Sequence, residues 1–348
     1  MPQRPQTRAT IAMALAMLPI GSVVHAQSIN GAWTTPSLDR WMYPFNTSPG
    51  SRPVISVFGS DANDPTMFDS RDGQFLVGWS TGDQVPVGTP TSEMTVHAAM
   101  VEVEFANDLV VQYDPTQDPW QIFAPSTSAD WQADADPGQS VELFGVGFRN
   151  GFTAATFQEF SPFAPSGSNI LAPGVRSAYA MSFNGSGQAI DVSNNPRQRF
   201  DPMAFAVGQC PALQPGDFIP AGTRMTFELD VGDSRIQQYV RDGLSAGRLL
   251  FSISSLSFVV QQGGSFPAFY ARENALVTIG AATAAQLQVN VSIAPGCQPA
   301  DLDCNARVDG ADLGLLLSNW GGFGPGDLDD NGQVDGADLG AMLSSWTG

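Results

Sequence analysis

Two twelve-residue segments near the C-terminal end carry oxygen-bearing side chains at the same spacing, and the second begins 26 residues after the first. They span residues 301–312 and 327–338, with such side chains at positions 1, 3, 5, 9 and 12. A hard cation such as calcium takes six to eight oxygen ligands at about 2.3–2.6 Å, and position 7 of such a loop contributes its backbone carbonyl. We therefore expect two calcium ions, one in each segment. The expected ligands are Asp301, Asp303, Asn305, Arg307, Asp309 and Asp312 in the first loop, and Asp327, Asp329, Asn331, Gln333, Asp335 and Asp338 in the second.

The two loops differ at position 6, where a sharp turn favours glycine because glycine adopts positive φ at little cost. Gly332 occupies this position in the second loop, whereas the first loop has Ala306. We therefore expect the first loop to be strained or to bind calcium more weakly. Both loops end on aspartate, which is shorter than the glutamate of an ordinary EF-hand, so each following helix should begin closer to the metal.

An apolar pattern with i, i+3, i+4, i+7 spacing follows each loop and predicts an amphipathic helix of about two turns. Helices this short are marginal alone in water, so we expect the two apolar stripes to bury against each other. Segments rich in glycine and proline precede both loops, so each unit is a loop followed by one helix. The stripes consist of Leu313, Leu316, Leu317 and Trp320, and of Leu339, Met342, Leu343 and Trp346.

The paired loop–helix units in residues 297–348 resemble type I dockerin modules, which are calcium-binding tails that attach secreted proteins to cohesin receptors. The resemblance implies a small α-helical, calcium-dependent module over residues 296–348, with a cohesin-like or other envelope receptor as its partner. Dockerins often carry recognition residues at loop positions 10 and 11. Both copies here have Gly-Ala at these positions (310–311 and 336–337) instead of the hydroxyl pair of cellulosomal examples. The near-symmetric duplication further implies that one receptor would bind in two orientations.

The first 26 residues predict a secretory signal peptide. Arg4 and Arg8 precede an apolar run over residues 11–24, and Val24-His25-Ala26 fits a small-residue cleavage site. A transmembrane anchor is the alternative, but the run is short and contains proline and glycine. No later stretch approaches a membrane span in length. The mature protein is therefore expected to be secreted, in the extracellular space or associated with the cell surface.

The charge of the chain excludes several classes of partner. The sequence contains no lysine, and after removal of the two signal-peptide arginines 13 arginines stand against 34 acidic residues, a net charge of 13 − 34 = −21. Nucleic acid and anionic membranes are poor partners for such a surface. The excess of carboxylates suits a salty or calcium-containing exterior, and a composition bias of the genome is an equal alternative.

Three cysteines remain in what should be an oxidising compartment. Cys297 and Cys304 are seven residues apart and lie at the entry to the first loop. We expect a disulfide between them, which would brace the loop that lacks glycine at position 6. Cys210 is left over and is expected to be a buried thiol.

Residues 27–295 contain about ten short β-type runs separated by clusters of Gly, Pro, Asn and Asp, a pattern typical of all-β domains. The expected fold is a jelly-roll-like β-sandwich with one amphipathic helix, which Asp233 or Ser234 would cap and Gly247 would end. The predicted strands are 74–79, 95–105, 109–113, 141–148, 178–183, 225–231, 249–256, 275–279 and 287–293.

The order of strand, helix, glycine turn and strand around residues 225–254 is similar to extracellular jelly-roll modules of the DNRLRE type, some of which bind polysaccharides. Residues 114–175 would then form an insertion that the simple module lacks. Within that insertion, Trp120 and Trp131 lie among polar residues and are candidates for sugar binding. Several phenylalanines in a Gly-rich stretch are interpreted as core residues beneath long loops: Phe148, Phe152, Phe157, Phe160 and Phe163.

No pattern indicates a catalytic residue. After signal removal His97 is the one histidine left, no lysine can form a Schiff base, and no Gly-x-Ser-x-Gly nucleophile elbow occurs. Acid pairs on one strand face, 102 with 104 and 228 with 230, are usually solvated. The interpretation is a secreted, non-catalytic binding or structural β-sandwich protein attached to a cell-envelope or scaffold receptor by its tail. The alternative is a polysaccharide-degrading glycoside hydrolase or lyase with a dockerin tail.

Overall fold

The computed structural model describes residues 26–59, 69–259, 266–294, 298–305 and 307–347. The chain divides into two compact units, the body (Gln27–Ala294) and a second unit that contains the tail (Pro295–Gly348). The predicted signal peptide lies outside the described residues except for Ala26. Within the described part of the chain, no helix is long and apolar enough to cross a membrane.

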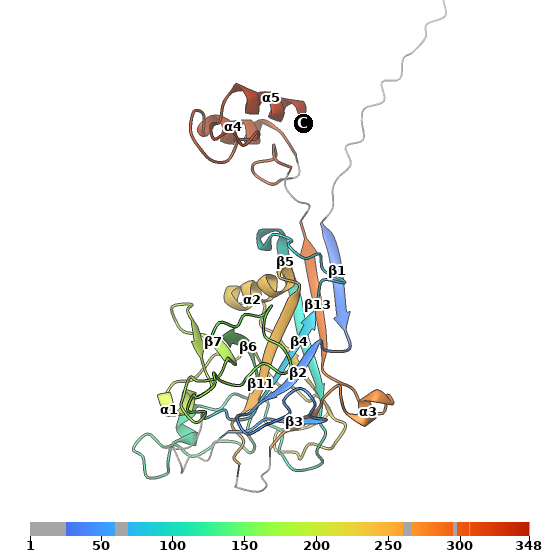
Figure 1. Cartoon of the computed structure of the whole chain (residues 1–348), viewed down its shortest axis with the longest axis vertical. Coiled ribbons are helices and arrows are strands. Elements are labelled where there is room, and N and C mark those ends of the chain that lie inside the picture. The colour runs from blue at the N-terminus through green and yellow to red at the C-terminus, as the bar shows by residue number, and fades with distance from the viewer. Residues whose placement is uncertain (1–25, 60–68, 260–265, 295–297, 306, 348) are drawn as a thin grey trace, which may run out of the picture. The chain divides into compact units, whose positions relative to one another are not determined.

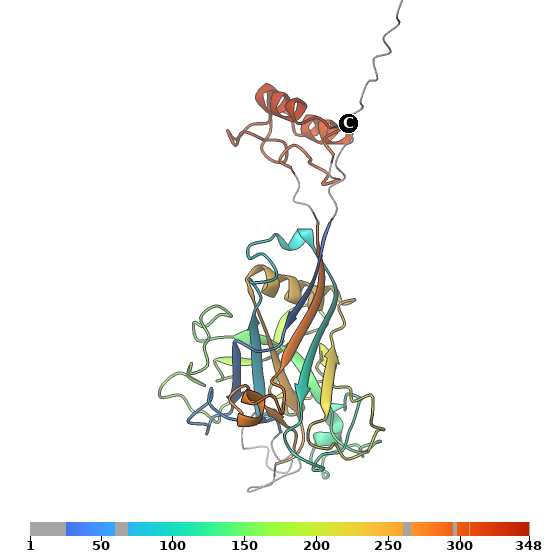
Figure 2. The ribbon, with the colours of Figure 1, turned by 90° about the vertical axis from the view of Figure 1, so that its right-hand side faces the viewer.

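The body is mainly β, and its strands form antiparallel sheets in a sandwich-like arrangement (Figure 1). A four-stranded sheet has the order β1 (Gln27–Trp33), β13 (Gln286–Ile293), β5 (Met94–Glu104) and β10 (Arg224–Glu228). A seven-stranded sheet has the order β2 (Leu38–Met42), β4 (Gln74–Ser80), β11 (Arg248–Ser255), β6 (Val141–Phe148), β7 (Ala178–Phe183) and β8 (Ala189–Asp191), with β9 (Ala206–Val207) paired to β6. A third, two-stranded sheet joins β3 (Val54–Ser56) and β12 (Ala268–Tyr270). Figure 2 shows the strands of the four-stranded sheet side by side.

The largest hydrophobic core draws on both large sheets. Along β11, Leu249, Phe251 and Ile253 join this core, whereas Leu250 joins a second cluster. This split follows from the period of two along a strand, which sends successive side chains to opposite faces. From the four-stranded sheet, Val101 and Phe227 enter the same core. The seven-stranded sheet is therefore apolar on both faces.

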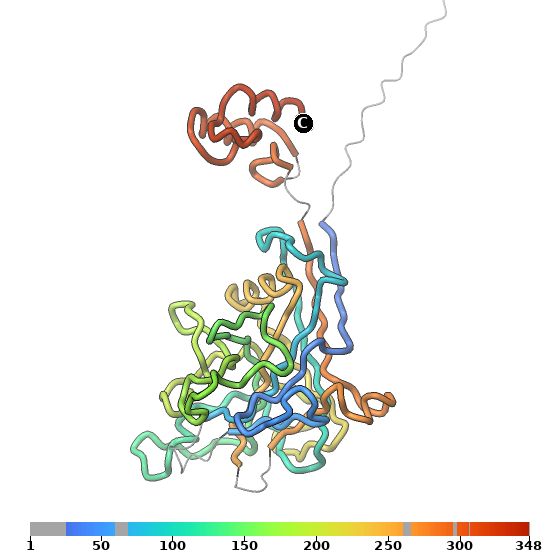
Figure 3. The backbone as a smooth tube through the Cα atoms, in the orientation of Figure 1, coloured from blue at the N-terminus to red at the C-terminus, as the bar shows by residue number. Residues whose placement is uncertain are grey.

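A chain excursion between β6 and β7 supplies the second cluster. Phe157 is fully buried there against Leu76 and Leu250, with Phe152 and Phe163 packed beside it. Figure 3 traces this excursion in green. The predicted core role of the phenylalanine-rich stretch is confirmed for these residues, whereas Phe160 is 67% exposed.

The predicted amphipathic helix is confirmed as α2 (Ser234–Ser245), and it lies against β5 and β11 (Figure 1). Its N-cap Asp233 accepts a hydrogen bond from the Arg235 backbone amide, and Gly247 follows its C-terminal end with φ +71°. The other helices of the body are one turn long: η1 (Thr91–Glu93), η2 (Trp120–Phe123), α1 (Asn195–Gln198) and α3 (Ala275–Thr278).

Two predicted strands are wrong. Residues 275–278 of the predicted strand 275–279 form the helix α3, because Asn274 accepts a hydrogen bond from the Leu276 amide and thereby caps the N-terminal turn. Residues 109–113 form no strand: Leu109 has φ +55°, which interrupts an extended backbone, and Gln112 makes an isolated bridge to Phe218. The short strands β1, β2, β3, β8, β9 and β12 were not predicted.

In the tail, two nine-residue helices follow the loops, α4 (Gly310–Ser318) and α5 (Gly336–Ser344). A small core lies between the repeats and combines loop position 8 with one helix residue from each copy. Its buried members are Ala300, Val308, Leu316, Val334 and Met342, and its half-buried members are Leu302, Leu313, Leu328 and Leu339.

The expectation that both whole apolar stripes bury against each other is wrong for half of each stripe. Leu313 and Leu316 of the first stripe face the core, as do Leu339 and Met342 of the second. Leu317 and Trp320, by contrast, are 51% and 48% exposed. The same division recurs at Leu343 and Trp346, at 53% and 41%. Each helix ends two residues before its tryptophan, so the tryptophans lie beyond the helical stripe.

Candidate metal centre

Each loop brings three of its predicted ligands together. Oxygen atoms of Asp301, Asp303 and Asp312 lie within 4.8 Å of one another, and so do those of the corresponding residues Asp327, Asp329 and Asp338. Two ligands of one calcium ion, each at about 2.3–2.6 Å, are at most about 4.6–5.2 Å apart. All three oxygens of each cluster are therefore close enough to bind a single calcium ion. Carboxylates also match the preference of calcium for hard oxygen donors.

The last aspartate of each loop is buried and fixed by backbone amides. Asp338 Oδ1 accepts hydrogen bonds from the amides of Leu328 (2.6 Å) and Asp329 (3.2 Å), and its Oδ2 accepts one from Asp335 (2.8 Å). These hydrogen bonds hold the pKa of Asp338 below its ordinary value, although desolvation opposes the shift. The carboxylate is thus kept charged at the position where the helix begins.

The first loop repeats this arrangement at Asp312. Its carboxylate accepts from the amides of Leu302 (2.7 Å), Asp303 (3.1 Å) and Asp309 (2.8 Å). Desolvation acts to raise the pKa of Asp312, but the backbone hydrogen bonds prevail and lower it. In both copies the residue at position 12 closes a capping box with position 9, which joins the loop to its helix.

The remaining predicted ligands lie beside these carboxylates or on the loop surface. At position 5, the side-chain amide of Asn305 donates to Asp303 Oδ2 at 3.0 Å, and the side-chain amide of Asn331 donates to Asp329 Oδ2 at 3.1 Å. At position 9, Asp309 accepts from the Ala311 amide at 2.8 Å, and Asp335 likewise acts as a helix N-cap. The side chains of the position-7 residues, Arg307 and Gln333, are exposed, as expected where a backbone carbonyl is the ligand.

At position 6 the comparison of the loops is incomplete because Ala306 lies outside the described residues. In the second loop Gly332 has φ +89°, and its amide donates to Asp327 Oδ2 at 2.8 Å. Position 4 is left-handed in both loops, with φ +59° at Cys304 and +53° at Asp330. The second loop therefore has the glycine turn that the spacing predicts.

Hydrogen bonds between the repeats connect each loop to the end of the other helix. The Val308 amide and carbonyl pair with Thr347, which follows α5, at 2.7 Å and 3.0 Å. In the second loop, Val334 pairs with Gly321 and Gly322, which follow α4, at 2.8 Å and 3.0 Å. Since each repeat is hydrogen-bonded to the other, the two acidic clusters belong to one connected unit.

The cysteines agree with their predicted states where the structure describes them. Cys304 is disulfide-bonded, while its predicted partner Cys297 lies outside the described residues. Cys210 is a free, buried thiol, and burial raises its pKa to about 12. A thiol with so high a pKa is unreactive at neutral pH.

The candidate sugar-binding tryptophans lie near a common arginine. Trp120 begins η2, and the Arg199 guanidinium is 6.0 Å from its ring centre. Arg199 also forms an ion pair with Asp130 (3.0 Å), next to Trp131, which is 43% exposed. The structure thus places one partly covered and one exposed tryptophan in the β5–β6 excursion.

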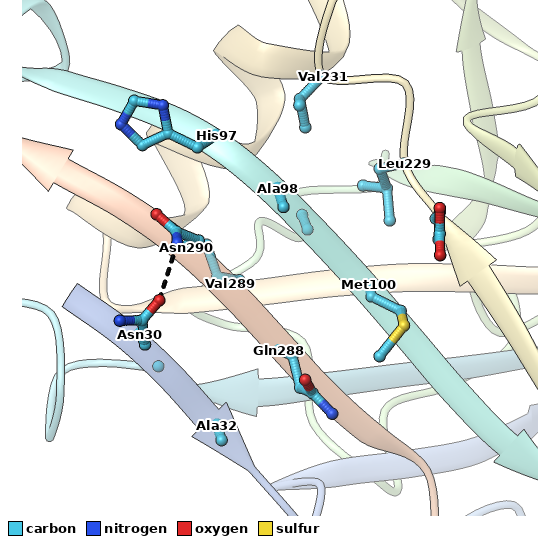
Figure 4. Close-up of a pocket in the computed structure, with 13 residues that line it drawn as sticks. Asn30, Ala32, His97, Ala98, Met100, Leu229, Val231, Gln288, Val289 and Asn290 are labelled. Carbon is cyan, nitrogen blue, oxygen red and sulfur yellow. Dashed lines mark hydrogen bonds between the residues drawn. The ribbon is translucent and has the colours of Figure 1, made fainter. Parts of the chain in front are cut away.

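A groove of about 510 Å³ on the four-stranded sheet is lined by residues of β1, β5 and β13 and by the segment after β10 (Figure 4). His97 and Asn290 lie on neighbouring strands there, and Asn290 donates to Asn30 Oδ1 at 2.8 Å. His97 Nε2 forms a hydrogen bond of 2.8 Å with Ser292 Oγ. Glu228 is the one carboxylate among the lining residues, so this groove contains no acid pair.

The acid pairs noted in the sequence have separate structural partners. Glu102 forms an ion pair with Arg224 at 3.1 Å. Glu104 is buried and accepts from the Thr283 amide (2.9 Å) and hydroxyl (2.6 Å). Asp230 accepts from the Gly232 amide at 3.1 Å in a turn. Each of these three acids has a local structural role.

Among the described residues, the paired acidic clusters of the tail are the strongest candidate site. No protein-family model and no curated protein matches the sequence.

Proposed function

We propose that the chain is a secreted, non-catalytic β-sandwich protein whose dockerin-like tail binds two calcium ions and docks to a cohesin-like or other envelope receptor. The observation that carries this proposal is the repeated geometry of the tail. Each copy gathers the carboxylates of loop positions 1, 3 and 12, and each exposes an equivalent leucine and tryptophan, Leu317 with Trp320 and Leu343 with Trp346.

Calcium would act on the tail by neutralising the gathered carboxylates. Three like charges within 4.8 Å repel one another, so a bound divalent ion favours the closed loop over open ones. Asp312 and Asp338 lie in the first turn of α4 and α5, so the same ion would join the start of each loop to its helix. Calcium binding and folding of the tail would then be coupled.

The exposed apolar side chains support a docking role. Leu317, Trp320, Leu343 and Trp346 are each 41–53% exposed, and Phe323 is 88% exposed. Exposed aromatic and aliphatic side chains that repeat with a structural duplication are typical of protein-binding surfaces. The Gly-Ala residues at loop positions 10 and 11 offer no polar side chain, so the leucines and tryptophans would supply most of the binding energy.

A calcium-dependent capture experiment tests this proposal. The full mature chain is immobilised and incubated with solubilised envelope proteins, with calcium and with EDTA. We expect a receptor to be captured with calcium alone, and to be lost in a Trp320→Ser, Trp346→Ser double variant. Trp131→Ser in the body is the matched control and should capture the receptor normally. Capture that is independent of calcium and of the tail tryptophans would contradict the proposal.

Two further measurements separate the alternatives. Isothermal titration of Asp327→Ala and Asp301→Ala should show the greater loss of calcium affinity in Asp327→Ala, because the second loop has the glycine turn at Gly332. Equal losses would show that the loops are equivalent. Incubation with a panel of polysaccharides should give no new reducing ends and no unsaturated products. Turnover of any polysaccharide would instead establish the degrading enzyme that is the alternative.

A further inference from the structure

A third group of carboxylates lies in the body, in the excursion between β5 and β6. Asp114 and Asp118 stand near its beginning, and Asp136 stands near its end, close to the start of β6. Oxygen atoms of the three lie within 4.8 Å of one another. Asp114 and Asp118 are four residues apart, but Asp136 follows 18 residues after Asp118, so the path of the chain brings it to the other two.

Two oxygen atoms of this group are buried without a partner. Asp114 is 3% exposed, and its Oδ1 accepts from the Thr116 amide and hydroxyl, both at 2.8 Å. Its second oxygen, Oδ2, is buried and has no hydrogen-bond partner, and the same holds for Asp118 Oδ2. Burying an unpaired carboxylate oxygen is costly unless a cation or a donor compensates it. The Thr116 hydroxyl also contacts Asp136 Oδ2 at 3.2 Å, which connects the two ends of the group.

The charges that act on this group are negative. Burial raises the pKa of Asp118 to about 8, and the other causes of the shift are the carboxylates Asp114, Asp134, Asp136 and Glu142. Asp114 also has a raised pKa, because burial and the two later aspartates outweigh its hydrogen bonds to Thr116. No arginine is among the main causes of either shift.

Another group of three acids in the body is neutralised by an arginine. Asp39, Glu159 and Glu273 also lie within 4.8 Å of one another, but Arg272 stands among them. The Arg272 guanidinium contacts Asp39 (3.2 Å), Glu159 (2.7 Å) and Glu273 (2.8 Å). This group therefore has its own counter-charge, whereas none of the arginines that the structure describes forms an ion pair with the Asp114 group.

We propose that Asp114, Asp118 and Asp136 form a calcium site in the body, distinct from the two sites of the tail. The donors are carboxylate oxygens, which suit calcium better than the softer transition metals. Their mutual distances allow all three to bind one ion. Waters would complete the six to eight ligands that calcium takes.

Such an ion would hold the two ends of the excursion together. The excursion contains η2 with Trp120, and further along it the exposed Trp131. It is also attached to the body by hydrogen bonds, such as the Trp120 amide to Asp201 (2.6 Å) and the Gln117 side-chain amide to the Pro202 carbonyl (2.6 Å), and by the ring contact of buried Phe123 with Phe258 at 6.0 Å. Calcium would thus fix the surface on which the two tryptophans are displayed.

The test uses the full chain with its tail sites disabled by Asp312→Ala and Asp338→Ala. Equilibrium dialysis against radioactive calcium should show one bound ion per chain in this background. Adding Asp118→Asn should abolish that binding or weaken it at least tenfold, and Asp136→Asn should do the same. Asp130→Asn is the matched control, because Asp130 lies in the same excursion but pairs with Arg199. It should bind calcium as the parent does.

Hydrogen–deuterium exchange of the same proteins gives a second readout. Calcium should slow exchange in peptides from residues 114–136 of the parent and of Asp130→Asn, but not of Asp118→Asn. The proposal is overturned if the tail-disabled chain binds no calcium, or if Asp118→Asn and Asp136→Asn bind it as tightly as Asp130→Asn. If the two tail sites do not bind calcium, the unmodified chain should bind one ion instead of three. This result is distinguishable from failure of the body site, which would leave two.

Discussion

Leu316 and Leu317 are consecutive residues of α4, and together they test whether the tail is a cooperative unit with a small core. Leu316 is fully buried with Val308, Val334 and Met342, whereas Leu317 is 51% exposed. Replacing a buried leucine by alanine costs about 2–5 kcal/mol, because transfer energy is lost and a cavity remains. At an exposed position the same change alters stability by about 0.5 kcal/mol or less.

The tail is small enough for the loss at Leu316 to be decisive. At roughly 0.05–0.15 kcal/mol per residue, a unit of about fifty residues has about 3–8 kcal/mol of stability. A loss of about 3 kcal/mol would remove a large share of it. Since about 1.4 kcal/mol corresponds to a tenfold change in an equilibrium constant, amide protection should fall about a hundredfold.

The assay is hydrogen–deuterium exchange of the full chain in calcium, read in α5, the helix that does not carry the change. Leu316→Ala should accelerate exchange in Gly336–Ser344, because Met342 of that helix shares the core with Leu316. Leu317→Ala should leave exchange in α5 unchanged while weakening receptor capture. If Leu316→Ala affects α4 alone, or if both variants affect α5 equally, the reasoning that the repeats share one core is refuted.

Three other predictions concern the body and the disulfide. Burial raises the pKa of Asp72 to about 8, above its value of about 4 in an unfolded chain, so its contribution to stability is full below pH 4 and is lost as pH rises to 8. Urea unfolding should accordingly show a smaller loss of stability between pH 4 and pH 8 in Asp72→Asn than in the parent. Phe251→Ala should cost about 3–5 kcal/mol in calorimetry, whereas Phe160→Ala should cost about 0.5 kcal/mol or less, since Phe251 is fully buried and Phe160 largely exposed. Reduction should destabilise the tail by about 2–4 kcal/mol through Cys304 and leave the body unchanged, because Cys210 is a free thiol; loss of the body transition on reduction would contradict this.

The longest strands were predictable because their patterns show a period of two, although β1 was missed despite its seven residues. The strands β5 and β13 have eleven and eight residues, and the sequence predicts both within two residues at either end. Strands of two or three residues, such as β9 and β8, cannot show a period, so they were missed. The run Ala275–Thr278 is apolar and contains β-branched residues, yet the cap at Asn274 makes it helical. Here one hydrogen bond outweighs intrinsic preference.

The acidic clusters of the tail and of the body also differ in how far they could be predicted from the sequence. The tail clusters are local, so the spacing of Asp301, Asp303 and Asp312 in the sequence was enough to predict that they come together. What the spacing did not predict is that position 9 caps the helix instead of joining the carboxylates. The cluster around Asp114 and Asp118 could not be found from sequence, because Asp136 reaches it through the path of a long excursion.

The chain has fewer arginines than acidic residues, so some clustered carboxylates need another counter-charge. The sequence has no lysine, so fifteen arginines and two histidines face thirty-four acidic residues. Buried acids in the body take arginines as partners: Glu142 pairs with Arg71 at 2.5 Å and Asp69 pairs with Arg176 at 2.8 Å. A divalent ion can neutralise several of the remaining clustered carboxylates at one point. Calcium would then be a structural requirement of the body as well as of the tail, and EDTA should lower the melting temperature of both units. With the tail sites disabled, EDTA should still destabilise the body, and no such effect would mean that the body balances its acids without a metal.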